Sequence, residues 1–230
     1  MTMRQGAIVS GADYILVIGD KNFSSWSLRP WLALKQCGIP FDEVCVRLRQ
    51  PESKTAILQH SPAGKVPVLK AGDLVIWDSL AILEFLAEQH PDCRLWPADK
   101  DARAEARAVS AEMHAGFPAV RNDMSMDLLS RLPPPPDSDA LRSEIGRIVA
   151  IWKGARARQG RGGPFLFGTF SNADAMYAPV ATRFRTYGVD LASFGDDGSA
   201  QAYAETLLAL PAMAAWTDGA EAEMKVRAAS

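Results

Sequence analysis

Hydrophobic residues in the first ninety positions form short runs and alternations, a pattern typical of strands joined by helices. The apolar, β-branched run over residues 14–20 predicts a buried strand. Alternation of apolar and polar residues over 41–48 predicts a second strand, and Leu74–Trp77 predicts the returning strand of a hairpin. Apolar residues spaced three and four apart predict helices over 27–37 and 80–89.

The segment between the second strand and the hairpin is less regular. Residues 51–59 predict either a short helix or an irregular segment. Residues 60–69 begin as a turn and end as a strand that starts near Pro67, where a missing backbone N–H is tolerated. Because a strand–helix–strand unit gives parallel neighbours and a hairpin gives antiparallel ones, the whole order predicts a small mixed sheet covered by helices.

No strand pattern returns in the second half of the chain. Residues 90–101 contain two prolines and little periodicity, so they predict a linker. A long helical pattern over 102–132 is interrupted near 116–118, and the prolines at 133–136 predict a spacer. Further helices are predicted over 141–158, 172–187, 199–209 and 211–223. We therefore expect a loose N-terminal extension at 1–12, an α/β domain at 13–89, a linker at 90–101 and an all-helical domain at 102–230.

Charge and hydropathy exclude several classes of partner. The 230 residues include 25 Lys and Arg against 27 Asp and Glu, and 48% are hydrophobic, which suffices for a sizeable core. No basic stripe interleaved with aromatic residues indicates a nucleic-acid partner. No apolar run approaches the roughly 18 residues that span a bilayer, and the N-terminus has no apolar signal segment. We expect no nucleic-acid partner and no membrane association.

The cysteines and histidines indicate neither a disulfide framework nor a metal site. Cys37, Cys45 and Cys93 are an odd number at wide spacing, and such cysteines are usually small buried hydrophobes. The three histidines, at 60, 90 and 114, have no ligand spacing and are expected at the surface or at helix ends. We expect a reducing, cytoplasmic location and no metal.

Residues 22–31, NFSSWSLRPW, join the first strand to the first helix and are the strongest candidate for chemistry. Ser24, Ser25 and Ser27 can each cap a helix, and Pro30 suits a first helical turn. The unpaired amides of a helix start favour an anion, and a serine hydroxyl beside them can donate a hydrogen bond to a thiolate. The alternative is that these serines only cap the helix. The same two interpretations compete at Asp78-Ser79, where the second clear helix begins.

Four segments in order, SSWSLRPWLAL, SPAGKVPVL, DSLAILEFLAE and SNADAMYAPV, resemble the soluble glutathione transferase family. The resemblance covers nearly all of residues 14–225 and is closest to the serine-type classes, especially the zeta class with its SSCS turn. It implies a thioredoxin-like N-terminal domain (βαβαββα) followed by an all-α domain, with glutathione as co-substrate and a homodimeric assembly. Asp174, in the capping-box position of the fourth segment, would be structural.

The resemblance also assigns roles to individual residues. It implies that Ser24 is the catalytic hydroxyl, with Ser25 as its main rival. Val66 would pair its backbone with the cysteinyl part of glutathione, next to a cis Pro67. Asp78 and Ser79 would hold the γ-glutamyl end, and Lys54 or Lys65 would reach the glycyl carboxylate.

An electrophile would bind between the first-half turn and the second-half helices, as ligands often do at a domain interface. Met113, Phe117, Val120 and Met124 share the long helical pattern and either line this pocket or belong to the core. The resemblance implies conjugation of glutathione to a small electrophile, with two alternatives. One is a zeta-type cis–trans isomerase of the maleylacetoacetate isomerase kind. Trp26 argues against it, because that class has a cysteine at this position of the turn. The other is a non-catalytic binding protein.

Overall fold

The computed structural model describes residues 13–229, so the extension predicted at 1–12 lies outside the described residues. In the N-terminal half, a four-stranded sheet has the order β2-β1-β3-β4. β1 and β2 are parallel, whereas β1 and β3, and β3 and β4, are antiparallel. The predicted mixed sheet is therefore confirmed. Its strands are β1 (Tyr14–Gly19), β2 (Asp42–Val46), β3 (Val68–Ala71) and β4 (Leu74–Trp77).

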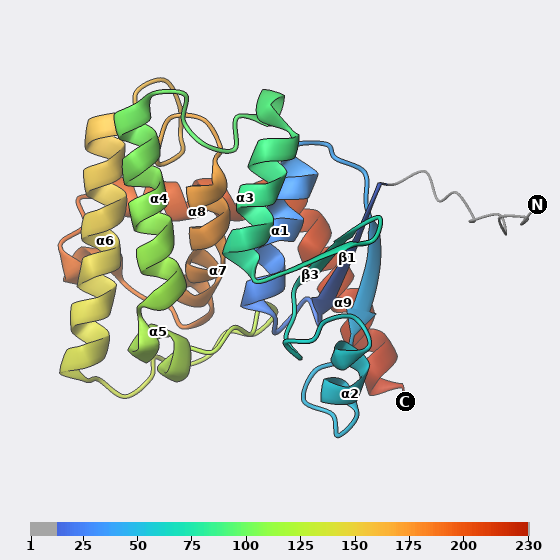
Figure 1. The fold of residues 1–230 in the computed structure, drawn as a ribbon. Coiled ribbons are helices and arrows are strands. Elements are labelled where there is room, and N and C mark those ends of the chain that lie inside the picture. The colour runs from blue at the N-terminus through green and yellow to red at the C-terminus, as the bar shows by residue number, and fades with distance from the viewer. Residues whose placement is uncertain (1–12, 230) are drawn as a thin grey trace, which may run out of the picture.

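Three helices accompany the sheet: α1 (Ser25–Gln36), α2 (Ser53–Leu58) and α3 (Ser79–Gln89). α1 and α3 lie between the sheet and the helical half, while α2 lies at the far end of the sheet (Figure 1). Side chains alternate across β1: Leu16 and Ile18 enter the main core, and Val17 joins a smaller cluster with Ile57 of α2. Residues 51–59 thus contain a short helix, the first of the two alternatives.

The helical half packs around α7, whose apolar residues are buried on all sides of the helix. Its helices are α4 (Lys100–Ala115), α5 (Pro118–Asp123), α6 (Asp139–Gln159), α7 (Asn172–Thr186), α8 (Ser199–Leu208) and α9 (Pro211–Ala228). Single 3-10 turns occupy Pro91–Cys93 and Leu191–Phe194. The α/β plus all-α arrangement predicted from the sequence is confirmed.

The capping box that opens α7 is present as predicted. Asp174 is fully buried and accepts from the Ser171 backbone at 2.8 Å and the Ser171 hydroxyl at 2.9 Å. Its other oxygen accepts from the Leu166 N–H at 3.1 Å and the Tyr203 hydroxyl at 2.9 Å. Four donors therefore fix the start of the central helix.

The helical prediction over 102–132 is wrong at its C-terminal end. The helix breaks at Gly116-Phe117, where Phe117 has a φ of 61°, and α5 ends at Asp123. Residues 124–138 contain no helix. Their backbone groups bond elsewhere: the Leu128 N–H donates to the Asn22 carbonyl at 3.1 Å, and the Leu132 N–H donates to the Thr186 carbonyl at 2.8 Å. Contacts with residues distant in sequence replace helical bonds that local periodicity favours.

The C-terminal helix α9 returns to the N-terminal half and passes beside the sheet (Figure 1). The indole N–H of Trp216 donates to the Lys21 carbonyl at 2.8 Å, and the Trp216 ring lies 5.0 Å from the Trp31 ring. Lys21 Nζ pairs with Glu223 at 3.2 Å and with Glu43 of β2 at 2.6 Å.

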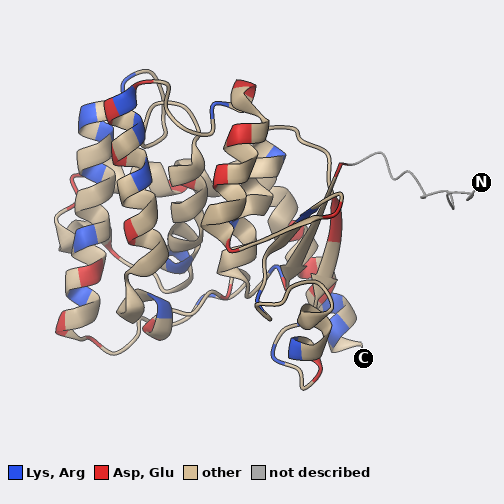
Figure 2. Cartoon of the chain, in the orientation of Figure 1, with Lys and Arg blue, Asp and Glu red and all other residues tan. Residues whose placement is uncertain are grey.

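Lys and Arg positions are interspersed with Asp and Glu positions along α4 and α6 in the view of Figure 2. Within residues 13–229 no helix is long and apolar enough to cross a membrane.

Candidate functional site

A cleft of about 660 Å³ lies where the loop before β3 meets the starts of α1 and α3 and the end of α4. It brings together five of the residues predicted to bind a ligand. It does not include Lys54, Ser24 or Ser25 in its lining. The lining residues are Trp26, Ile57, Ala63, Lys65, Val66, Pro67, Trp77, Asp78, Ser79 and His114.

One wall of the cleft is the segment that leads into β3. The peptide bond between Val66 and Pro67 is cis, as the resemblance implies. Pro67 immediately precedes β3, so its missing N–H removes no bond from the ladder. Lys65 comes directly before Val66 and lines the same cleft.

Asp78 forms the N-cap of α3 and has a φ of 76°, which is uncommon for a residue with a side chain. Its Oδ1 accepts from the Leu80 N–H at 2.9 Å and the Ala81 N–H at 3.3 Å. Its Oδ2 lies 3.1 Å from Nε2 of His114 on α4. One carboxylate therefore caps a helix of the N-terminal half and contacts the helical half.

Burial lowers the pKa of His114, and the charges of Arg29 and Arg121 lower it further, while Asp78 opposes them. The neutral imidazole therefore predominates at pH 7, with Nε2–H assigned as the donor to Asp78. His114 was expected only at the surface or at a helix end. It does lie in the last turn of α4, but it also lines the cleft. Sequence spacing gave no sign of this, because its partner is 36 positions away.

Trp26, which lines the cleft, lies against two guanidinium groups. Arg29 lies 4.3 Å and Arg121 lies 4.7 Å from the Trp26 ring, and the His114 ring meets it edge-on at 5.3 Å. Arg29 is 1% exposed and donates to the Ser79 hydroxyl at 3.3 Å. Burial lowers the pKa of Arg29 to about 9, and repulsion from Arg121 and Arg183 contributes. The guanidinium is still charged at neutral pH.

The three serines of the turn have different partners. Ser24 caps α1: its Oγ accepts from the Ser27 N–H at 3.3 Å and donates to Ser27 Oγ at 2.8 Å. Ser27 Oγ also accepts from the Gly19 N–H at 3.1 Å. Ser25 Oγ instead accepts from Nη2 of Arg183 on α7 at 3.1 Å. All three side chains are buried.

Arg183 reaches the turn from the central helix of the other half. Its second nitrogen donates to the Met124 carbonyl. Burial lowers the pKa of Arg183 to about 10, with a further contribution from Arg121, so it carries its charge at neutral pH. No local sequence feature predicted this contact, since Ser25 and Arg183 are 158 positions apart.

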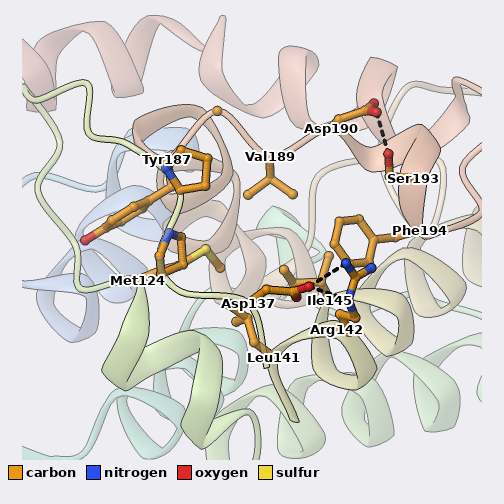
Figure 3. A pocket seen from close by; sticks show the side chains of 13 residues that line it. Met124, Asp137, Leu141, Arg142, Ile145, Tyr187, Val189, Asp190, Ser193 and Phe194 are labelled. Carbon is orange, nitrogen blue, oxygen red and sulfur yellow. Dashed lines mark hydrogen bonds and ion pairs between the residues drawn. The ribbon is translucent and has the colours of Figure 1, made fainter. Parts of the chain in front are cut away.

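Met113, Phe117 and Val120 were predicted either to line the electrophile pocket or to belong to the core. They are 2%, 6% and 0% exposed, lie in the main hydrophobic core and are absent from the lining of the cleft. Met124 is also buried, and its side chain lines a second cavity of about 440 Å³ (Figure 3). In that cavity Leu141, Ile145 and Phe194 form apolar walls.

Two family models match this chain: "Glutathione S-transferase, N-terminal domain" over residues 23–89 and "Glutathione S-transferase, C-terminal domain" over residues 135–219. Maleylpyruvate isomerase of a Ralstonia species is 30% identical over 177 residues, which is 74% of this chain and 83% of the relative. The chain belongs to the glutathione S-transferase family. Family membership and the isomerase among its relatives indicate a glutathione-dependent enzyme, as the sequence analysis predicted.

Further relatives and solved structures support the same family assignment. A probable maleylacetoacetate isomerase of Caenorhabditis elegans is 38% identical over 107 residues, 46% of this chain and about half (49%) of the relative's length. The solved holo structure of maleylpyruvate isomerase, a bacterial zeta-class glutathione S-transferase, is 26% identical, covers 88% of this chain and 95% of its own, and has a TM-score of 0.66. A Burkholderia homologue with bound glutathione, 20% identical, shares the fold with a TM-score of 0.66 over 90% of this chain and 97% of its own.

Proposed function

We propose that this transferase binds glutathione in the cleft between the β3 loop and the start of α3 and adds its thiolate to a small electrophile. The observation that carries the proposal is that Lys65, Val66, Pro67, Asp78 and Ser79 line one cleft. All five come from the two motifs that resemble glutathione-binding segments of the family. A cleft of about 660 Å³ is within the usual range for small-molecule sites.

Glutathione is an extended tripeptide with an ammonium group, two carboxylates and a thiol, and the cleft offers a partner for each polar end. The Val66 backbone would pair with the cysteinyl peptide group. The γ-glutamyl carboxylate would lie at Ser79, near the first amides of α3, where a helix favours an anion. Its ammonium would meet Asp78. Lys65 would contact the glycyl carboxylate, with Lys54 as a more distant candidate.

Activation requires that the thiol lose its proton at neutral pH. A free thiol has a pKa of about 8.5, so only a few per cent is thiolate at pH 7. A serine hydroxyl at the start of α1 that donates to the sulfur, together with the amides of the helix, favours the charged form. The thiolate then attacks an electrophilic carbon, so that an S–C bond forms and a leaving group departs with its electron pair.

A glutathione-dependent isomerase is the second candidate, and the names of the relatives favour it. In that reaction the thiolate adds to a carbon–carbon double bond, the new single bond rotates, and the thiolate leaves with its electron pair. The opposing observation is Trp26, whose indole lines the cleft where the zeta turn has cysteine. The third candidate is a protein of this family that binds without turnover.

Calorimetric titration with glutathione, followed by assays on a panel of electrophiles and on a cis-unsaturated diketo acid, separates these candidates. We expect saturable binding and turnover of at least one halogenated aromatic electrophile. Turnover of the diketo acid alone would establish the isomerase, and binding without any turnover would establish the third candidate. Absence of glutathione binding would refute the proposal.

A matched pair of variants tests the location of the site. Asp78→Asn should weaken glutathione binding by about tenfold, because a carboxylate partner of the ammonium is lost. Asp190→Asn makes the same change at a residue that caps a 3-10 turn and lines the second cavity, so binding should not change. Equal effects of the two variants would place glutathione elsewhere.

We also propose that the protein is a homodimer and that it is cytoplasmic. Light scattering on purified protein tests the dimer.

A further inference from the structure

The hydrogen bonds of the turn leave the three serines unequal as donors. Ser24 Oγ donates a hydrogen bond to Ser27 Oγ at 2.8 Å and accepts one from the Ser27 N–H at 3.3 Å. To donate to a ligand it would have to break a bond inside the turn. Ser27 is 0% exposed and accepts from both Gly19 and Ser24. With Ser24 assigned as the donor of that bond, both hydroxyls are engaged within the turn.

Ser25 is in the opposite state. Its Oγ accepts from Arg183 Nη2 at 3.1 Å, and the hydrogen bonds of the described residues include none that takes its proton. A hydroxyl that accepts from a cation becomes a stronger donor, because hydrogen bonds in a chain polarise one another. Ser25 is not itself a lining residue, but it directly precedes Trp26, which lines the cleft.

Arg183 is fixed where this polarisation needs it. One nitrogen donates to the Met124 carbonyl and the other to Ser25, so two bonds determine its orientation. The side chain of Met124 is itself held in the second cavity, where Figure 3 shows it among apolar residues. The guanidinium therefore extends from α7 to the first residue of α1 with little freedom to move.

The surroundings of Arg183 carry more positive than negative charge. Arg29 and Arg121 lie close enough that repulsion among the three guanidinium groups lowers the pKa of Arg29 and of Arg183. The acidic groups that oppose them are Asp78 beside Arg29 and Glu144 beside Arg121. Partly unbalanced buried cations favour an anion, and a thiolate is one.

We propose that Ser25, held and polarised by Arg183 from the other domain, is the hydroxyl that donates to the glutathione sulfur, and that Ser24 is a structural cap. The inference rests on the proposed function. It makes Ser25 a catalytic residue, because it contacts the sulfur, and Arg183 a positioning residue that acts through Ser25. The activation of the thiol then depends on contact between the two halves of the chain.

The decisive measurement is the pKa of enzyme-bound glutathione, followed by the ultraviolet absorbance of the thiolate as a difference spectrum against pH. Ser25→Ala should raise that pKa by about one unit or more, and so cut kcat/KM near pH 6.5 about tenfold. The dissociation constant of glutathione should change less than about threefold, because most binding groups remain. Ser24→Ala should instead lower the melting temperature and raise the pKa by less.

Arg183→Met should reproduce the effect of Ser25→Ala, and Arg183→Lys should restore part of it, because a charge alone can polarise the hydroxyl. A merely structural Arg183 would lower the melting temperature without moving the pKa of the bound thiol. If Arg183→Met does not fold, the pKa of the bound thiol in Ser25→Ala and in Arg183→Lys tests the inference instead.

The titration has one internal confounder. The ionisable groups nearest to Ser25 and Arg183 are Arg29 on α1, Arg121 on α5 and Tyr187 at the end of α7. Further off lie Asp78, His114, Glu144 beside Arg121, and Tyr177 beside Arg29. Of these, only His114 has an ordinary pKa between 5 and 8. The titration is therefore repeated in a His114→Gln background, where the difference between Ser25→Ala and the parent should persist.

Two failures are distinguishable. A larger rise of the thiol pKa in Ser24→Ala than in Ser25→Ala would overturn this inference and leave the proposed function intact. Wild-type protein that does not bind glutathione would overturn the proposed function itself.

Discussion

His114 Nε2 lies 3.1 Å from Asp78 Oδ2, so a hydrogen bond joins the last turn of α4 to the first turn of α3 inside the cleft. The two halves of the chain therefore meet at the residue that is expected to hold the ammonium group of glutathione. Ser25 and Arg183 make a second link of the same kind at 3.1 Å.

The first prediction concerns acid sensitivity through His114. Burial lowers its pKa in the folded chain below the unfolded value of about 6.5, so below that pH the unfolded chain binds more protons. The contribution of neutral His114 to the free energy of unfolding should be fully present above pH 6.5. It should be lost as the pH drops from 6.5 through the lower pKa of the folded chain. His114→Gln should reduce this slope in chemical denaturation measured between pH 7 and 5. An identical slope in both proteins would mean that other groups cause it.

The second prediction concerns the cap of α7. Asp174→Asn replaces an oxygen by an N–H₂ group among four donors, so buried donors lose their acceptor. We expect a loss of about 2–4 kcal/mol in the free energy of unfolding. Asp190→Asn is the matched control, since it removes an exposed cap of a short turn and should cost about 1 kcal/mol or less. Equal losses would refute the structural role of Asp174.

The same residue predicts a pH dependence of opposite sign to that of His114. Desolvation raises the pKa of Asp174 to about 6 although its four hydrogen bonds lower it. Between the unfolded value and pH 6 the folded chain holds the extra proton, so this contribution to stability is present at low pH and lost as the pH rises through 6. The stability of wild type relative to Asp174→Asn should therefore decline from pH 4 to pH 7. A rising difference would contradict the assignment.

Much of the fold could be predicted from the sequence because local pattern and backbone geometry agree. Alternation and capping residues predicted the sheet, α3 and the capping box at Ser171. Residues 124–132 could not be predicted, because their backbone bonds go to Asn22 and to α7 rather than along a helix.

The candidate site could be predicted in part for a similar reason. Val66, Pro67 and Asp78 belong to contiguous motifs, and the structure places them in one cleft. Their binding roles stay predictions. Trp26 also contacts Arg121 and His114, and Ser25 contacts Arg183, across about 90 to 160 positions of sequence. No periodicity encodes which side chains will meet across that distance.

The third prediction concerns Asn22, which joins the N-terminal half to the non-helical segment 124–132. Asn22 donates to Asp127 at 2.9 Å and accepts from the Leu129 N–H at 2.9 Å, so it anchors the non-helical segment. Asn22→Ala should increase hydrogen exchange over residues 124–132 and lower the free energy of unfolding by about 1–3 kcal/mol. Asn122→Ala, at an exposed position of α5, should do neither. Unchanged exchange in Asn22→Ala would show that apolar packing alone holds the segment.

The fourth prediction concerns Trp26. Trp26→Ala removes contacts with two guanidinium groups, which together contribute about 1–2 kcal/mol, and widens the cleft. The ratio of kcat/KM for a bulky electrophile to that for a small one should rise. Trp77→Ala is the control, since Trp77 lines the cleft but is 47% exposed. A ratio that rises equally in both variants would show that Trp26 has no special place in selectivity.

Because α9 returns to the sheet, we expect the N-terminal half to depend on this helix for its folding. Without α9, the indole of Trp31 and the carbonyl of Lys21 would lose the Trp216 side chain that covers them. A fragment that stops after α3 should therefore expose apolar surface that α9 normally covers, and it should aggregate. Shortening the chain by its final twenty residues should harm the first domain as much as the second.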